Sequence, residues 1–175
     1  MSEEQKKQVL YLIACGTPVA QRLYGLVPLL QAEGWETCVI LTPTATRFVD
    51  RERLSILTGY PVRSEYKQPD EPDVLPRADA ILVFPATFNT LNKWALGISD
   101  TLALGLLCEL TGLKLPILAI PLIRKGGGLD THPAFARSLR LLKKYGVHVF
   151  YEPDKYPPRN EVSDEGILKE LHQML

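Results

Sequence analysis

Short apolar runs that alternate with helical patterns constrain the fold of this chain more than any other feature. Val9–Ala14 is continuously apolar, and Trp35–Thr42 and Asp79–Phe84 are further strand candidates. A strand that is apolar on both faces is typical of a parallel sheet with helices on both sides. Two shorter runs, Ile117–Ile120 and Val147–Tyr151, repeat the pattern toward the C-terminus. We therefore predict an α/β protein with a three-layer, Rossmann-like or flavodoxin-like fold around a parallel sheet of five or more strands.

The segments between these runs mostly show the apolar spacing of helices. Helices are predicted over 19–33, from Thr44 onward, over 90–110, over 134–145 and over 165–174. The exception lies between Leu57 and Arg77, where glycine and several prolines exclude a long helix or a central strand. We expect an extended surface segment there, and such segments often carry functional residues.

Length and composition argue for a single domain and against several classes of binding partner. The 175 residues predict a single domain over residues 1–175. Twenty Lys and Arg balance twenty Asp and Glu, so no net positive charge attracts nucleic acid or anionic lipid. No apolar run approaches the roughly 20 residues that cross a bilayer. The three cysteines lack metal-ligand spacing and are typical of free thiols in a reducing compartment. We expect a cytoplasmic protein without metal, nucleic-acid or membrane partners.

Four loops that follow the predicted strands are candidates for a ligand site. They contain Gly16 and Thr17, Thr42 to Thr46, Pro85 to Asn92, and Pro121 to Asp130. The carboxyl ends of parallel strands meet at one edge of a sheet, where helix N-termini and small hydroxyls suit a phosphate. The glycine patterns of NAD-binding and of P-loop proteins are both absent. Each loop taken singly is more simply explained by helix capping, but four together favour a phosphorylated ligand.

One stretch of the chain carries a specific signature. Pro85–Asp100 reads Pro-Ala-Thr-Phe-Asn-Thr-Leu-Asn-Lys-Trp-Ala-Leu-Gly-Ile-Ser-Asp. It closely resembles the Pro-Ala-[Ser/Thr]-x-Asn-Thr-[Ile/Leu]-x-Lys-x-Ala-x-Gly-Ile-x-Asp motif of the homo-oligomeric flavin-containing cysteine decarboxylases. This family includes phosphopantothenoylcysteine decarboxylases and the peptidyl-cysteine decarboxylases of lantibiotic biosynthesis. The resemblance also covers 14–17, 41–48, 57–62 and 139–149, so only the two ends of the chain fall outside it.

The resemblance implies an FMN cofactor and a set of residues that hold it. By their positions in the motifs these are Gly16, Thr17, Thr42, Thr44, Ala86, Thr87 and Asn89. Backbone N–H groups and hydroxyls of this kind are what an anchored flavin needs. The resemblance also implies a homo-oligomer, a trimer or a multiple of one, with FMN at a subunit contact. Phe88 and Trp94 are then candidate interface aromatics, and core packing is the alternative for Trp94.

Two departures from the family pattern concern catalysis. Family members carry a histidine just before the third strand, and Glu71 stands at that position here. Glu71 is a candidate catalytic base, with a solvated surface charge as the alternative. After the fourth strand, the family's Pro-x-Met-Asn-x-x-Met clamp for the substrate carboxylate is replaced by Leu-Ile-Arg-Lys-Gly-Gly-Gly. Arg124 and Lys125 of this loop, together with Asn92, are expected to contact the substrate.

Three histidines are present. His132 follows the rewritten loop and is a second candidate base if the loop folds back, while a capping turn before Pro133 is the alternative. His148 in a predicted strand and His172 in the terminal helix are expected to be structural. No Ser-His-Asp or Cys-His arrangement emerges, since Cys15 has no identifiable base.

Four functions remain open. The first is an FMN-binding flavoprotein of this family that lacks the standard thiol-oxidising site. The second is an active FMN-dependent enzyme that oxidatively decarboxylates a cysteine-containing peptide or a pantothenoylcysteine substrate, with Glu71 or His132 as base. The third is a flavin prenyltransferase-like protein, whose prenyl phosphate would suit Arg124 and Lys125. The fourth is an interaction module without flavin.

Overall fold

The computed structural model describes residues 7–175. Within this range, five parallel strands form one sheet in the order β2-β1-β3-β4-β5. The strands are β1 (Val9–Ala14), β2 (Glu36–Leu41), β3 (Ala80–Ala86), β4 (Ile117–Pro121) and β5 (His148–Val149). This strand order is that of the flavodoxin-like folds, so the predicted fold class is confirmed.

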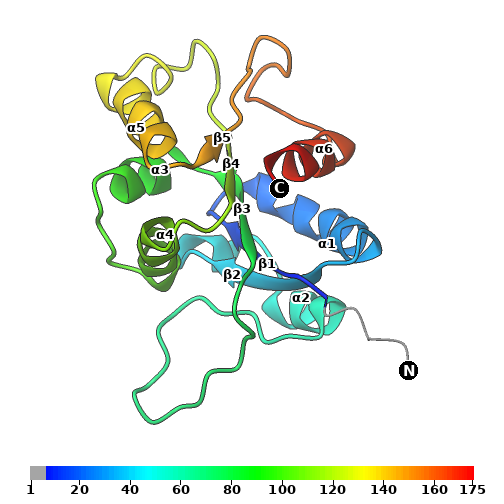
Figure 1. Cartoon of the computed structure of the whole chain (residues 1–175). Helices are drawn as coiled ribbons and strands as arrows, with labels where there is room; N and C mark the ends of the chain where they lie inside the picture. Colours follow the sequence, from blue (N-terminus) through cyan, green and yellow to red (C-terminus); the bar gives the residue numbers. More distant parts are fainter. Residues whose placement is uncertain (1–6) are drawn as a thin grey trace.

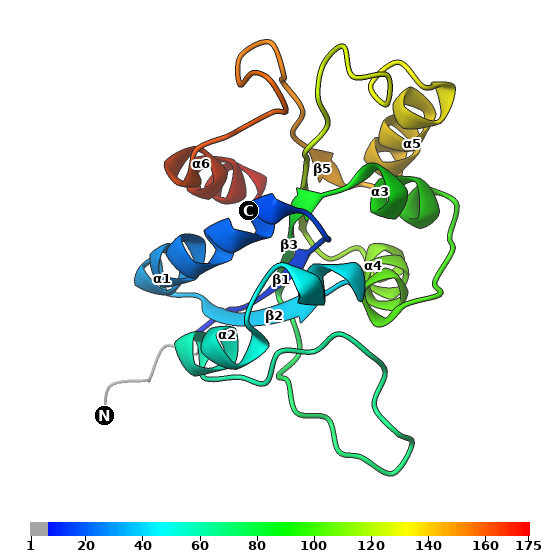
Figure 2. The same cartoon turned by 180° about the vertical axis from the view of Figure 1, so that it is seen from behind.

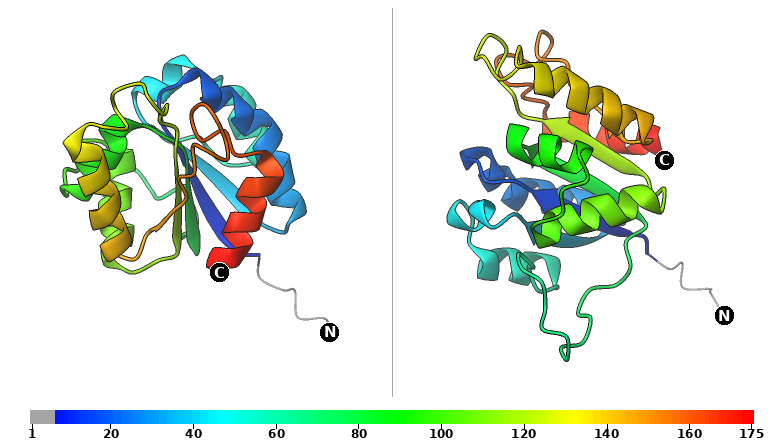
Figure 3. Two further views of the ribbon diagram at one scale, coloured as in Figure 1. Left: turned by 90° about the horizontal axis from the view of Figure 1, so that it is seen from above. Right: turned by 90° about the vertical axis from the view of Figure 1, so that its left-hand side faces the viewer.

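Helices cover both faces of the sheet (Figure 1, Figure 3). They are α1 (Leu23–Ala32), α2 (Arg51–Thr58), α3 (Phe88–Ala95), α4 (Leu102–Gly112), α5 (Pro133–Lys144) and α6 (Asp164–Met174), with the 3-10 turns η1 (Pro18–Arg22) and η2 (Thr44–Arg47). Helices α1, α2 and α6 pack on one face, and α3, α4 and α5 on the other. Within residues 7–175, none of them is both long and apolar enough to cross a membrane.

The sheet separates two hydrophobic cores, and β1 contributes to both. Leu10 and Leu12 pack against the helices of the first face, whereas Tyr11 and Ile13 pack against those of the second. Every residue of this strand is buried. Burial on both faces explains why its sequence is apolar without interruption.

Two predicted elements differ from the structure. The single helix expected over 90–110 is wrong, because the chain forms α3 and α4 with a break at 96–101. Gly97 has a φ of 73°, which ends α3, and the Thr101 hydroxyl oxygen accepts the N–H of Leu104 to begin α4. The fifth strand is also shorter than expected and comprises only His148–Val149.

The chain crosses from α2 to β3 as an extended segment, residues 59–79, as its prolines predicted. Arg63 first pairs beside β2: its N–H donates to the carbonyl of Val39 at 3.2 Å, and its carbonyl accepts the N–H of Leu41 at 2.8 Å. This pairing covers the open edge of the sheet. The segment then extends away from the body of the molecule, at the bottom of Figure 1 and Figure 2, before it returns to β3.

Candidate functional site

A cavity of about 370 Å³ opens where β1, β2 and β3 end. After β1 the chain forms β2 on one side of it and later β3 on its other side. The edge where these strands end is therefore a topological switch point, where open α/β sheets bind ligands. The cavity is lined by Gly16, Thr42, Pro43, Thr44, Thr87, Asn89, Thr90, Lys93, Thr101 and Leu104. Its size falls within the range of small-molecule sites. The structure thus brings together Gly16, Thr42, Thr44, Thr87 and Asn89, which were predicted to hold the cofactor.

The first two loops of the cavity touch at Gly16 and Thr44. A Cβ atom on Gly16 would lie 2.6 Å from Cγ2 of Thr44, far inside the optimal separation of carbon atoms. Gly16 is therefore required by space and not by an unusual backbone conformation. The close approach of the two loops shapes this side of the cavity.

Thr87 links β3 to α3 and caps the helix. Its Oγ1 accepts the N–H of Thr90 at 3.5 Å. The N–H groups of Phe88 and Asn89, in the first turn of α3, have no carbonyl partner within the helix. Together with the helix dipole, these donors favour an anion. Thr42 Oγ1 accepts the N–H of Ala45 in the turn η2 at 3.3 Å, so both threonines hold the local backbone and are ligand candidates at once.

Lys93 is a cavity residue that the sequence analysis did not single out. It lies one turn after Asn89, so both side chains project from the same side of α3. Lys93 Nζ lies 2.7 Å from a carboxylate oxygen of Asp100, and this hydrogen bond lowers the pKa of Asp100. The spacing of Lys93 from Asn89 was the available signal. The sequence analysis missed Thr101 and Leu104 because it predicted one continuous helix over 90–110. Such a helix would not bring the start of α4 back to the cavity.

Cys15 lies fully buried at the end of β1, and its thiol is near Thr87 and Thr90. Burial raises the pKa of the thiol, so the group is neutral at physiological pH. A neutral thiol is a poor nucleophile. Cys15 therefore acts as a packing residue, and its N–H ties β1 to the carbonyl of Pro85 at 3.0 Å.

Two further predicted cofactor residues adjoin the cavity without lining it. Thr17 caps η1, and its Oγ1 accepts the N–H of Val19 at 3.4 Å. Ala86 is fully buried, and its carbonyl accepts the N–H of Leu122 at 2.9 Å. Both residues hold the backbone of a cavity loop in place.

Asn92 and Trp94 make contacts within the chain and do not line the cavity. The side-chain carbonyl of Asn92 accepts the hydroxyl of Ser138 at 2.7 Å, which ties α3 to α5. Trp94 is 2% exposed, and its indole N–H donates to Thr111 Oγ1 at 3.0 Å. The side chain of Asn92 is thus held by a hydrogen bond within the chain, and its contact with a substrate stays a prediction. Trp94 is a core residue and not an exposed interface aromatic.

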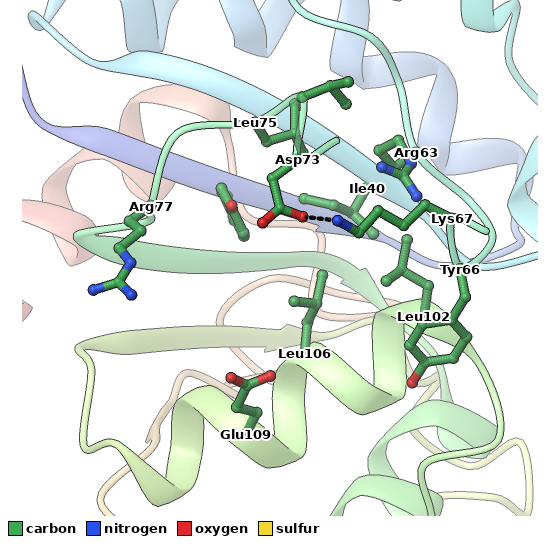
Figure 4. A pocket seen from close by; sticks show the side chains of 12 residues that line it. Ile40, Arg63, Tyr66, Lys67, Asp73, Leu75, Arg77, Leu102, Leu106 and Glu109 are labelled. Atoms are coloured by element: carbon green, nitrogen blue, oxygen red, sulfur yellow. Dashed lines mark ion pairs between the residues drawn. The ribbon is translucent and has the colours of Figure 1, made fainter. Parts of the chain in front are cut away.

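Glu71 lies on the extended segment, outside the cavity. Its side chain is exposed, and its carboxylate accepts the N–H of Gln68 at 3.0 Å. A second cavity of about 310 Å³, between this segment and α4, contains an ion pair of Lys67 and Asp73 at 2.6 Å (Figure 4). None of the predicted site residues lines this second cavity. Within one chain, Glu71 and the predicted cofactor residues do not come together, and its role as a base stays a prediction.

His132 forms a capping turn at the start of α5. Its Nδ1 accepts the N–H of Ala134 at 3.0 Å. The exposed ring stands edge-on to Phe88, with 5.5 Å between ring centroids. Phe88 precedes Asn89, so His132 lies near the cavity without lining it. Only Nε2 of this ring is left for proton transfer.

The two basic residues after β4 differ in their contacts. The ammonium of Lys125 pairs with the carboxylate of Asp154, and its N–H donates to the carbonyl of Pro158 at 3.0 Å. Arg124 is exposed and has no ion-pair partner in the part of the chain that the structure describes. Of these two basic residues, only Arg124 has a charge that is unpaired within residues 7–175.

The cavity suits a phosphorylated cofactor. Threonine hydroxyls, the free N–H groups at the start of α3 and the ammonium of Lys93 are all groups that bind phosphate. These residues fit the FMN that the resemblance implies. Over residues 7–175, no group of three or more His, Cys, Asp and Glu could hold a metal ion.

Fold and cavity together define a flavodoxin-like protein with a polar cavity at the switch point of its sheet. Residues 1–171 match the family model described as Flavoprotein. The chain therefore belongs to the flavoprotein family that contains the FMN-dependent cysteine decarboxylases.

Individual relatives agree with this assignment. Mouse phosphopantothenoylcysteine decarboxylase is 33% identical over 155 residues, which are 83% of this chain and 72% of that protein. The coenzyme A biosynthesis bifunctional protein CoaBC of Borreliella burgdorferi is 26% identical over 157 residues, 87% of this chain and 38% of that protein. The chain thus spans well under half of this bifunctional relative. The crystal structure of the FMN-dependent cysteine decarboxylase TvaF from thioviridamide biosynthesis superposes with a TM-score of 0.75 at 22% identity, covering 95% of this chain and 98% of that one.

Proposed function

We propose that this chain binds FMN in the cavity at the ends of β1, β2 and β3. The observation that carries the proposal is that residues of three separate loops, each predicted to hold the cofactor, surround one cavity. Thr42 and Thr44 offer hydroxyls from one side. The start of α3 and Lys93 offer N–H donors and positive charge from the other. A flavin bound there supplies an acceptor for two electrons.

We further propose that the protein lacks the standard thiol-oxidising site. Among the described residues that line the cavity, the only titratable side chain is that of Lys93, which is already paired with Asp100. Glu71 lies on the extended segment, and His132 has committed its Nδ1 to a helix cap. Without a base in reach of the flavin, the chain would use or hold the cofactor for another task.

A homo-oligomer, a trimer or a multiple of one, is part of the proposal. The extended segment exposes Tyr66 to 60% and Val74 to 42%, and a neighbouring copy would cover such side chains.

An active oxidative decarboxylase of a cysteine-containing peptide or of pantothenoylcysteine is the second candidate. The unpaired charge of Arg124 favours it, because such a substrate presents a carboxylate. The similarity to the mouse phosphopantothenoylcysteine decarboxylase supports the substrate class. In the overall reaction the thiol-bearing carbon chain loses two electrons to the flavin, and the carboxylate leaves as carbon dioxide.

Anaerobic mixing separates the two candidates. The FMN-loaded protein is combined with a peptide that ends in cysteine or with phosphopantothenoylcysteine, and flavin bleaching and carbon dioxide release are followed. The first candidate predicts that the flavin stays bound and oxidised. Bleaching with release of carbon dioxide would contradict it and establish the second. Glu71→Gln and His132→Ala would then show which residue acts as the base, through loss of the chemical step with flavin retained.

A further inference from the structure

A groove of about 490 Å³ opens between the C-terminal ends of α3, α4 and α5. These helices lie side by side on one face of the sheet, with α3 in the middle (Figure 1). Trp94 and Leu96 line the groove from the end of α3, Cys108 and Gly112 from α4, and Leu141 from α5. The ends of α4 and α5 lead into the amino ends of β4 and β5. The groove therefore lies at the opposite edge of the sheet from the proposed flavin cavity.

Hydrogen bonds between the helices fix the shape of the groove. The indole N–H of Trp94 donates to Thr111 Oγ1 at 3.0 Å, which ties α3 to α4. The hydroxyl of Tyr145 donates to the carbonyl of Ala95 at 3.1 Å, which ties the end of α5 to α3. Lys114 Nζ lies 3.4 Å from the carbonyl oxygen of Tyr145 and joins the chain after α4 to the end of α5. The walls of the groove are thus held in place by the chain itself.

Large apolar side chains stand exposed around the groove. Leu96, Ile98 and Leu113 are exposed to 56%, 40% and 64%. Leu113 directly follows Gly112 of the groove wall, and the carbonyl oxygen of Ile98 lies 3.9 Å from Cys108 Sγ. A contiguous apolar surface with a charged rim is typical of a protein interaction site.

The rim of the groove is basic. Helix α5 has no acidic residue, and its four basic side chains are all exposed: Arg137, Arg140, Lys143 and Lys144. Within residues 7–175, neither these four nor Lys114 has an ion-pair partner. Arg137 lies one turn before Leu141, and Lys144 lies one turn after it, so both flank the groove wall along one side of the helix. The last two lysines also offset the helix dipole, but Arg137 and Arg140 precede the last turn, where this effect acts.

The nearby acidic residues do not neutralise this rim. Glu109 is the only acidic residue of α4, and it lines the second cavity, on the other side of the helix. Asp100 pairs with Lys93. The extended segment that a neighbouring copy would cover also borders the second cavity. The groove is therefore a separate surface with an excess of positive charge.

We propose that the groove between α3, α4 and α5 docks a partner protein through an amphipathic helix whose apolar side is flanked by acidic residues. The apolar side chains of the partner pack against Trp94, Leu96 and Leu141, and its carboxylates pair with Arg137 and the other basic residues of the rim. A groove whose shape is already fixed binds without the cost of ordering its walls. This inference goes beyond the proposed function and does not require flavin, because the groove and the flavin cavity lie at opposite edges of the sheet.

Fluorescence anisotropy with labelled probe peptides tests the charge preference. The probes are helical peptides of about 16 residues with leucine on one side, alanine on the other, and glutamate, glutamine or lysine at the positions between. The purified chain is expected to bind the glutamate peptide at least about tenfold more tightly than the glutamine peptide at low salt, and the lysine peptide most weakly. Added salt should reduce these differences.

Substitutions at one exposed position separate charge from hydrophobic contact. Leu113→Glu adds a negative charge to the rim and should weaken binding of the glutamate peptide about tenfold, whereas Leu113→Lys should weaken it clearly less. Ile56→Glu is the matched control, because Ile56 is 78% exposed on α2, on the other face of the sheet. The glutamate peptide should also slow the alkylation of Cys108, which lines the groove.

Several outcomes would overturn the proposal. Equal affinity for the three peptides, or equal binding of the glutamate peptide by Leu113→Glu and Ile56→Glu, refutes an acidic partner. Unchanged alkylation of Cys108 with the glutamate peptide bound refutes the groove as its site. If Leu113→Glu formed a smaller assembly than the wild type in sedimentation velocity, a second copy of the chain would cover the groove instead. If vesicles rich in phosphatidylserine displaced the glutamate peptide, the basic surface would bind a membrane and not a protein.

Discussion

Gly16 and Thr44 join the loops after β1 and β2 with no room for a side chain between them. A Cβ on Gly16 would lie 2.6 Å from Cγ2 of Thr44 and 2.9 Å from its backbone carbonyl carbon. Because the second atom is backbone, no side-chain rotation would relieve the contact. Both residues line the proposed flavin cavity, so its shape depends on this approach.

Gly16→Ala is expected to push the two loops apart. The free energy of unfolding should fall by about 1–3 kcal/mol, and FMN binding should weaken with it. Gly112→Ala is the matched control, because Gly112 ends α4 at the surface and a Cβ there would meet nothing within 4 Å. Urea unfolding and FMN titration measure the two effects. A Gly16→Ala variant that binds FMN like the wild type would show that the cavity is not the flavin site.

Thr87→Ala separates capping from cofactor binding. The loss of the cap of α3 should cost about 1 kcal/mol of folding free energy. Ser163→Ala removes an equivalent cap from α6, where Ser163 Oγ accepts the N–H of Gly166 at 3.1 Å. Both variants should lose similar stability in urea, but only Thr87→Ala should bind FMN more weakly. If the Thr87→Ala and Ser163→Ala variants bound FMN with equal affinity, Thr87 would act only as a helix cap.

Tyr66 and Gly105 anchor the extended segment to α4. The Tyr66 hydroxyl donates to the carbonyl of Thr101 at 3.3 Å, and a Cβ on Gly105 would lie 2.0 Å from that hydroxyl oxygen. Glycine inside a helix costs about 1 kcal/mol relative to alanine, so this contact explains its presence. Gly105→Ala should stabilise the protein by about 1 kcal/mol in a Tyr66→Phe background but by clearly less in the wild type. Additive effects in a double-mutant cycle would contradict the contact.

The thiols should differ in reactivity according to burial. Burial raises the pKa of Cys15 and of Cys108, and burial together with Glu36 raises that of Cys38 to about 12. A raised thiol pKa leaves less thiolate at a given pH, and the thiolate is the reactive form. At pH 8, iodoacetamide should therefore modify the partly exposed Cys108 slowly, and Cys15 and Cys38 only after unfolding. Mass spectrometry that found Cys15 modified in the folded protein would argue against its closed position beneath the cavity.

The sheet, and the grouping of the candidate loops at one of its edges, could be predicted because both follow from local sequence. β1 matches its predicted range, Val9–Ala14, residue for residue. A strand that is buried on both faces has a continuously apolar sequence, which can be recognised without the structure. Gly16, Thr42 and Thr87 were found because loops at the carboxyl ends of parallel strands meet at one edge.

Contacts between distant parts of the chain could not be predicted in the same way. The break between α3 and α4 depends on a left-handed conformation at Gly97, and a glycine within a helical pattern is often tolerated without one. Lys125 forms an ion pair with Asp154 of another loop. The sequence around Lys125 contains no signal for this pairing. The position of Glu71 away from the cavity follows from the path of the extended segment, which its prolines do not determine.

Equilibrium dialysis of the purified chain against FMN and against riboflavin tests the central claim most directly. The account predicts one FMN bound per chain and riboflavin binding at least about tenfold weaker, because the donors at the start of α3 and Lys93 act on the phosphate. A chain that takes up no FMN from excess cofactor, or that binds riboflavin as tightly as FMN, would contradict it.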